Sequence, residues 1–327
     1  MAPAARRSPD RAAGQGRPAA GGRRTVSLLV VGEALVDLIL APDGSTRAVP
    51  GGGPFNLARA AARLGAATAF GGGVSDDAFG RRIAALLEAD GVALPLPPRR
   101  GLPTTLALAE LDAGGAATYH FYVEGTSAAA VEVGELALGP EVTALAVGTL
   151  GLVLEPVATA VEALVAAASD DVIVMVDPNC RPQIIRDEDA YRARLARVLR
   201  RADVVKVSGD DLAWLEPASE PLDAARDLVA AGARVVLFTD GADAVRVLLP
   251  DAEAVVAVPP VPVVDTVGAG DTFGGAFLAF WTTAGRTRDD LADLDLVRAT
   301  VERAVVAAGI TCTRPGADPP HLADLPV

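Results

Sequence analysis

Residues 265–281 place two glycines directly before an apolar helix. Gly268 and Gly270 carry no side chain, so backbone N–H groups there can converge on an anion, and the helix N-terminus adds partial positive charge. Asp271 falls in the first turn of this helix, where ionisation is favoured. A carboxylate beside an anion cradle supplies what phosphoryl transfer to an alcohol requires, because it pairs a base for the hydroxyl with dipoles for the phosphate charge. A capped helix with a glycine-rich entry is the simpler alternative.

Three other phosphate-binding motifs fail on this sequence. The dinucleotide fingerprint needs its third glycine at position 273, which is Phe273. The Walker A motif needs Gly-Lys-Ser/Thr, but Lys206, the only lysine in the chain, follows Val205. The strand lysine of protein kinases has no candidate for the same reason. Phosphate chemistry at the glycine segment is therefore expected to depend on backbone amides and arginine.

The composition bounds the class of protein. With 327 residues, 51% of them hydrophobic, the chain can bury a large core. Its net charge of −13 argues against nucleic acid or anionic membrane partners, and its uncharged apolar runs are too short for a transmembrane helix. Cys180 and Cys312 form no disulfide framework, which indicates a cytoplasmic protein. Two histidines cannot build a typical zinc site, so a divalent metal is expected to arrive with a nucleotide.

The chain divides into a tail and one folded domain. Residues 1–24 are rich in Ala, Pro, Gly and Arg without apolar periodicity, so we expect a disordered tail. The tail is not expected to be a secretory signal, because Arg6 and Arg7 are not followed by the apolar segment and cleavage site that such a signal needs. The apolar runs Ala67–Val74 and Val235–Thr239 predict strands, and Leu291–Gly309 predicts a final helix. From Ala144 onward, apolar strands alternate with helices, which predicts an α/β domain over 25–327 with a doubly wound, mostly parallel sheet flanked by helices. The runs Thr104–Leu111 and Ala116–Val123, joined by Asp-Ala-Gly-Gly, predict a hairpin in a small additional β element.

Other segments carry candidate ligand-binding residues, each with a structural alternative. The three glycines 51–53 permit close backbone approach and Asn56 can bind sugar hydroxyls, unless the segment only caps a helix. Asp37, among apolar neighbours, can accept two hydroxyls of a polyol or can face solvent. Phe121 or Tyr122 can cover a sugar ring.

Polar residues also follow the buried strands, where ligands gather in α/β sheets. The segments concerned are 177–182, which includes Arg181, then 206–211, and Thr239-Asp-Gly241. The alternative interpretation of these segments is a surface turn. For Ser208 and the acids that follow it, the alternative is the capped start of a helix. A water-mediated role near Mg²⁺ is the functional interpretation of Asp211.

Two of these segments together resemble the signatures of the ribokinase-like (PfkB) carbohydrate kinases. Residues 51–65 are similar to the first signature and residues 265–273 to the second, in the expected order, and the resemblance spans residues 26–325. Further segments resemble the fructokinase-like members: 31–37, 73–80, 104–112, 121–127, 177–181 and 314–320.

The resemblance implies roles for individual residues. It makes Asp271 the catalytic base and the amides of Gly268, Ala269 and Gly270 an anion hole. The implied sugar-binding residues are Asp37, Gly51, Gly52, Asn56 and Arg181, and Phe121 is a further candidate beside them. The implied nucleotide-side residues are Thr239 and Gly241, and further candidates for nucleotide binding are Lys206, Ser208 and Gly270. Ser208 and Asp211 stand where the family has N-x-x-E, and Asp265 with the carbonyl of Val267 stand where it holds a monovalent cation.

The resemblance further implies that the protein is an ATP-dependent sugar kinase. It also implies a β-sheet lid over the sugar site, drawn from about 33–50 and 99–124. Expected are Mg²⁺ with ATP, K⁺, fructose as acceptor, and a homodimer through the lid. A 2-keto-3-deoxygluconate kinase is the alternative, but an anionic substrate favours more arginines than the Arg47, Arg99 and Arg100 of these segments. A non-catalytic sugar- or partner-binding member is the other alternative, and the intact Asp271 loop argues against it.

Overall fold

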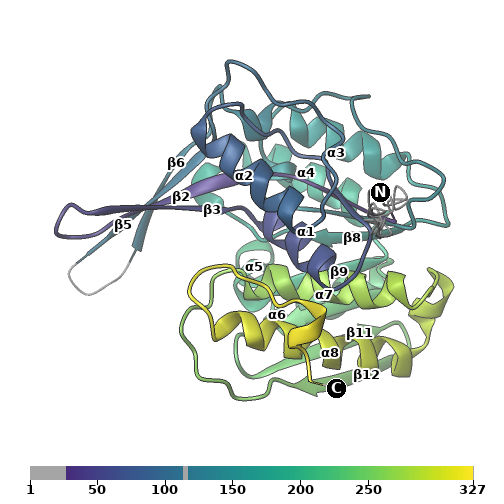
Figure 1. The fold of residues 1–327 in the computed structure, drawn as a ribbon. Coiled ribbons are helices and arrows are strands. Elements are labelled where there is room, and N and C mark those ends of the chain that lie inside the picture. The colour runs from purple at the N-terminus through teal and green to yellow at the C-terminus, as the bar shows by residue number, and fades with distance from the viewer. Residues whose placement is uncertain (1–26, 113–116, 327) are drawn as a thin grey trace, which may run out of the picture.

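The protein has two sheets, an eight-stranded one in the body and a four-stranded one that projects from it (Figure 1). This computed structural model describes residues 27–112 and 117–326. The predicted disordered tail 1–24 and most of the predicted 112–115 turn therefore lie outside the described residues.

The large sheet has the strand order β12-β11-β10-β9-β8-β7-β1-β4. Six strands, from β4 to β10, run parallel, and β11 and β12 form an antiparallel edge. The predicted doubly wound, mostly parallel sheet is thereby confirmed. The strands are β1 Leu28–Val31, β4 Thr68–Phe70, β7 Ala144–Gly148, β8 Ile173–Asp177, β9 Val204–Ser208, β10 Val235–Thr239, β11 Ala244–Leu249 and β12 Ala252–Ala257.

Helices cover both faces of this sheet and produce two hydrophobic cores. On one face the core contains side chains from α1 Gly53–Arg63, α2 Ala78–Ala89, α7 Ala269–Thr283 and α8 Leu294–Cys312. On the other it contains side chains from α3 Val157–Ala166, α4 Glu188–Leu199, α5 Gly209–Leu215 and α6 Pro221–Ala230. Because both faces are buried, strands such as β1 are apolar at every position rather than alternating. Short 3₁₀ helices are η1 Ser127–Ala129, η2 Thr149–Leu152, η3 Pro182–Ile184, η4 Asp289–Ala292 and η5 Leu322–Asp324.

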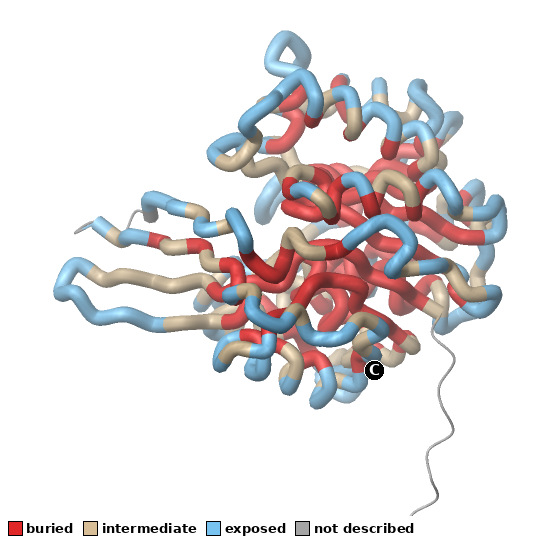
Figure 2. Tube along the Cα trace, turned by 90° about the horizontal axis from the view of Figure 1, so that it is seen from above, coloured by how far each residue is buried: buried red, intermediate tan, exposed pale blue. Residues whose placement is uncertain are grey.

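The small sheet has the order β3-β2-β5-β6 and is drawn from the segments expected to form a lid. Its strands are β2 Leu35–Leu40, β3 Thr46–Gly51, β5 Leu106–Leu111 and β6 Ala117–Tyr122. Only β2 and β5 run parallel, and burial decreases from the body toward the tip of the sheet (Figure 2). Its movement as a lid stays a prediction.

Local differences from the sequence expectations have packing causes. The strand expected over 67–74 ends at Phe70, because its pairing with β1 ends there, with Phe70 opposite Val30. The helix expected from Leu291 begins at Leu294, since Asp293 caps it with two hydrogen bonds. None of the described helices is both long enough and apolar enough to cross a membrane.

Candidate active site

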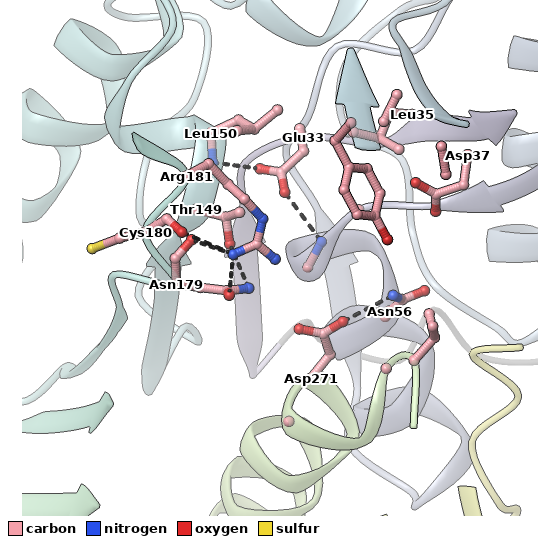
Figure 3. Close-up of a pocket in the computed structure, with 18 of the residues that line it drawn as sticks. Glu33, Leu35, Asp37, Asn56, Thr149, Leu150, Asn179, Cys180, Arg181 and Asp271 are labelled. Carbon is pink, nitrogen blue, oxygen red and sulfur yellow. Dashed lines mark hydrogen bonds between the residues drawn. The ribbon is translucent and has the colours of Figure 1, made fainter. Parts of the chain in front are cut away.

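A cavity of about 950 Å³ lies between the small sheet, the carboxyl ends of the central strands, and the first turns of α1 and α7. Figure 3 shows the side chains that converge on it. The sequence-predicted residues that line it are Asp37, Gly52, Asn56, Phe121, Arg181, Lys206, Ser208, Asp211, Asp265, Val267, Gly268, Gly270 and Asp271. Gly51, Ala269, Thr239 and Gly241 are not among the lining residues.

Asp271 and Asn56 connect the two helices that begin at this cavity. Asn56, in the first turn of α1, donates from Nδ2 to Asp271 Oδ2 at 2.9 Å. Asn56 is 4% exposed, and its Oδ1 has no hydrogen-bond partner among the described residues. A buried acceptor left open beside a carboxylate fits a hydroxyl group of a ligand.

The electrostatic environment of Asp271 suits a base. Burial raises the pKa of its carboxyl group above the ordinary value, while the Asn56 hydrogen bond and the positive charges of Lys206 and Arg181 oppose that rise. The negative charge of Asp37 adds to it. A carboxylate with a raised pKa accepts a proton more readily from an alcohol.

The loop before α7 forms the expected anion cradle only in part. Gly268 has φ +78°, and a Cβ there would lie 2.5 Å from that of Ala317, so glycine is required. The Ala269 N–H donates to Thr266 O at 3.2 Å, which leaves it less available than expected. The N–H groups of Gly270 and Asp271 belong to the first turn of α7, where a helix supplies no acceptor.

Lys206, one of the residues expected on the nucleotide side, adds a positive charge to this cradle beyond the backbone amides. Its Nζ donates to Asp177 Oδ2 at 2.9 Å, and it would lie 3.1 Å from a Cβ placed on Gly270. Lys206 and Asp177 are both buried, and burial raises the pKa of Asp177 to about 6 against the opposing effect of Lys206. Phosphate chemistry here therefore has a lysine as well as amides.

Two further charged side chains line the cavity, Asp37 of β2 and Arg181, which follows β8. A Cβ on Gly51 would lie 2.2 Å from Asp37 Oδ2, so the glycine leaves the space that this carboxylate occupies. Burial raises the pKa of Asp37 to about 6, and the charge of Arg181 opposes the rise. Arg181 itself donates from Nη1 to Asn179 O, Asn179 Oδ1 and Cys180 O at 3.1, 2.7 and 3.0 Å.

Both predicted metal positions have hydrogen-bond partners within the protein. Asp211 Oδ2 accepts from Ser208 N and Oγ, and Oδ1 accepts from Cys180 N, so the pair forms the capping box of α5, the structural alternative stated above. Asp265 accepts from Val267 N and Gly316 N. Metal binding by either residue stays a prediction. Thr239, which pairs with Ser208 across β9 and β10, and Gly241 lie at the same sheet edge outside the cavity lining.

Comparisons with known proteins decide the family. The family model described as pfkB family carbohydrate kinase matches residues 26–323. The chain belongs to the pfkB family of carbohydrate kinases. It is 36% identical over 262 residues to a fructokinase of Rhizobium leguminosarum bv. trifolii, covering 77% of this chain and 78% of the relative.

Solved structures agree with the family. A fructokinase of Xylella fastidiosa with bound ATP has a TM-score of 0.81 at 27% identity, covering 89% of this chain and 93% of that one. A fructokinase of Vibrio cholerae O395, solved with fructose, ADP and calcium, has a TM-score of 0.77 at 26% identity, covering 90% and 94%. A double mutant of the same Vibrio enzyme was solved with fructose, ADP and potassium at 25% identity, with the same TM-score and coverage. The ribokinase-like fold expected from the sequence is therefore confirmed.

This carbohydrate kinase also brings residues to the site that were not among the sequence candidates. Glu33 and Thr149 line the cavity, as does Asn179 of the predicted segment 177–182. Each lies one or two residues beyond the carboxyl end of a buried parallel strand, namely β1, β7 and β8. The same positional signal that selected Ser208 and Thr239 could have found Glu33 and Thr149.

We expect Gly51→Ala to weaken sugar binding. The new Cβ would lie only 2.2 Å from Asp37 Oδ2 and would therefore displace the Asp37 carboxylate. The KM for the sugar should rise about tenfold or more, corresponding to about 1.4 kcal/mol or more of lost binding, with little change in the KM for ATP. Steady-state kinetics check this. Gly309→Ala in α8 is the matched control, since its Cβ would make an ordinary 3.5 Å contact with Val261 and should leave both constants unchanged. An unaltered sugar KM in Gly51→Ala would contradict the prediction.

Proposed function

We propose that the protein transfers the γ-phosphate of ATP to a primary hydroxyl of fructose. The observation that carries this proposal is the position of Asp271, held by Asn56 between the α7 cradle and the Asp37 wall of one cavity. The fructokinase relatives, two of which are solved with fructose or ATP, support the same substrates.

The proposed mechanism assigns a task to each wall. Asp37, Asn56 Oδ1 and Arg181 orient the sugar so that its hydroxyl lies beside Asp271. Asp271 accepts the hydroxyl proton as the oxygen attacks phosphorus in line, and the bond from phosphorus to the leaving ADP oxygen breaks. The N–H groups of Gly270 and Asp271 and the ammonium group of Lys206 stabilise the transferred phosphoryl group. The small sheet, closing as a lid, excludes water that would otherwise accept the phosphate.

The charges of the cavity bear on the choice between neutral and anionic sugars. Asp37 and Asp271 are among the acids that line it, and their negative charges disfavour a substrate carboxylate. One observation favours the alternative, 2-keto-3-deoxygluconate: Arg47 of β3 lines the same cavity as Arg181. A panel of fructose, ribose, glucose, ketodeoxygluconate and nucleosides, compared by kcat/KM, distinguishes the two.

The proposal includes metal ions. Asp177 Oδ1 is buried without a hydrogen-bond partner among the described residues, and such an oxygen fits the hydration shell of Mg²⁺ held by ATP phosphates. When bound, Mg²⁺ neutralises phosphate charge. Asp211 offers only its remaining lone pairs to such a shell. Asp265 and the Val267 carbonyl supply oxygen ligands of the kind that K⁺ prefers, and the potassium-bound Vibrio relative supports that assignment.

We extend the proposal to the surroundings of the protein. A cytoplasmic location agrees with the two free thiols, Cys180 and Cys312. A homodimer through the lid is supported by the aromatic side chain of Tyr122 in β6, which is 58% exposed and lies on the face of the small sheet opposite Phe121. Nucleic acid and membranes are not proposed as partners, because the net charge of −13 opposes both.

Asp271→Asn tests the proposed base. We expect kcat to fall by about 10²–10⁴-fold, the usual contribution of a general base, while the sugar still binds. ADP release measures turnover, and isothermal titration measures sugar binding. Asp210→Asn is the control, because this exposed acid lines the same cavity without a proposed role. Near-full turnover in Asp271→Asn would refute the assignment.

The pH profile offers a second test. Burial raises the pKa of Asp37 to about 6 and raises that of Asp271. Both act as carboxylates, so kcat/KM for the sugar should be steady above about pH 7 and fall as pH drops through 6. In Asp37→Asn, loss of the negative charge that raises the pKa of Asp271 should move the remaining acid limb to lower pH. A profile that is flat from pH 5 to 8 in the wild type would contradict this.

A further inference from the structure

Glu33 is a buried acid at the centre of the site to which the proposed reaction gives no role. It follows β1, is 2% exposed, and lines the cavity. Its Oε1 accepts from Gly53 N and its Oε2 accepts from Leu150 N, both at 3.1 Å (Figure 3). Each carboxylate oxygen therefore holds one backbone N–H.

These two N–H groups belong to separate helical segments. Gly53 is the first residue of α1, whose N-cap, Gly52, has no side chain to accept from the helix. Leu150 lies in η2, directly after Thr149, which has the unfavourable φ of +50° for a residue with a side chain. Glu33 therefore supplies the missing cap of α1 and holds the strained turn after β7 against it.

The residue that Glu33 holds lies among the reacting groups. A Cβ placed on Gly53 would be 2.8 Å from Thr149 Oγ1, 3.3 Å from Asp271 Oδ1 and 3.4 Å from Asn179 Nδ2. A shift of about 1 Å at Gly53 would therefore change how α1 meets Asp271, and displacements of this size can cost about 10²-fold in rate.

Glu33 also shares the electrostatic field of the site. Burial raises the pKa of its carboxyl group to about 8, opposed by the Gly53 N–H bond and by Arg181 and assisted by the charge of Asp271. The two charged groups that shift the pKa of Glu33 are therefore Arg181, a proposed sugar-binding residue, and Asp271, the proposed catalytic base.

We propose that Glu33 is a positioning residue for phosphoryl transfer: its carboxyl group joins the first turn of α1 to the turn at Thr149–Leu150, and so holds Asn56 and Asp271 in register with the acceptor hydroxyl. This inference depends on the proposed kinase function.

Glu33→Gln tests it, because the amide keeps the shape of the side chain but turns one acceptor into an N–H₂ donor that faces a backbone N–H. We expect kcat/KM for the sugar to fall at least tenfold. Part of this loss should be a lower kcat, while the KM for ATP stays within twofold. Asp203→Asn is the matched control. Asp203 is also a buried acid, 1% exposed, that accepts from a backbone N–H, that of Val174, but it lies at the amino end of β9, away from the cavity. This control should lower the melting temperature and leave both KM values and kcat unchanged.

The outcomes separate a positioning role from a structural one. If Glu33→Gln behaves like Asp203→Asn, with lower stability but wild-type constants per folded molecule, the inference is overturned. Glu33→Asp, whose shorter side chain can reach only one of the two N–H groups, provides a second variant if the glutamine enzyme does not fold, and wild-type constants there overturn the inference too. A wild-type enzyme without turnover overturns the proposed function, whereas turnover that is equal in wild type and Glu33→Gln overturns this inference alone.

Discussion

The hydrogen bond from Asn56 to Asp271 joins the first turns of two helices that are 215 residues apart in the sequence. Both helices begin at the same edge of the large sheet, and α7 is buried along most of its length. Within α7, Phe277 and Trp281 stack with ring centroids 5.6 Å apart and anchor the helix in the core. The position of the proposed base therefore depends on the packing of the whole domain.

The site gathers acids at a considerable electrostatic cost. Glu33, Asp37, Asp177 and Asp271 all have raised pKa values, and burial is the largest cause for each. Such costs are typical of functional sites, since a structural core can be built without them. Two cations, Arg181 and Lys206, partly compensate these charges. An acidic protein can in this way offer a local cradle for a polyanionic nucleotide.

Several parts of the fold followed from local patterns. Strands such as Val235–Thr239 were predicted with their observed bounds, because continuous β-branched residues favour a strand buried on both faces. The capped helix after Ser208 was one of two interpretations of that segment, and the structure shows the capping box. The early end of β4 was not predictable, because it depends on where β4 stops pairing with β1, which is distant in sequence.

The candidate site also has parts that local sequence patterns predict and parts that only the tertiary structure shows. Glycine spacing alone identified the segments around Asn56 and Asp271, since close backbone approach and a helix N-terminus impose local requirements on residue type. The sequence by itself thus determined most of the strand and helix pattern, the family and the groups that we propose to hold phosphate and sugar. Only the tertiary structure decided that Lys206 reaches the cradle and that Glu33 ties α1 to the turn after β7. Those contacts depend on which strands are neighbours in the sheet, and no local pattern of residues encodes that order.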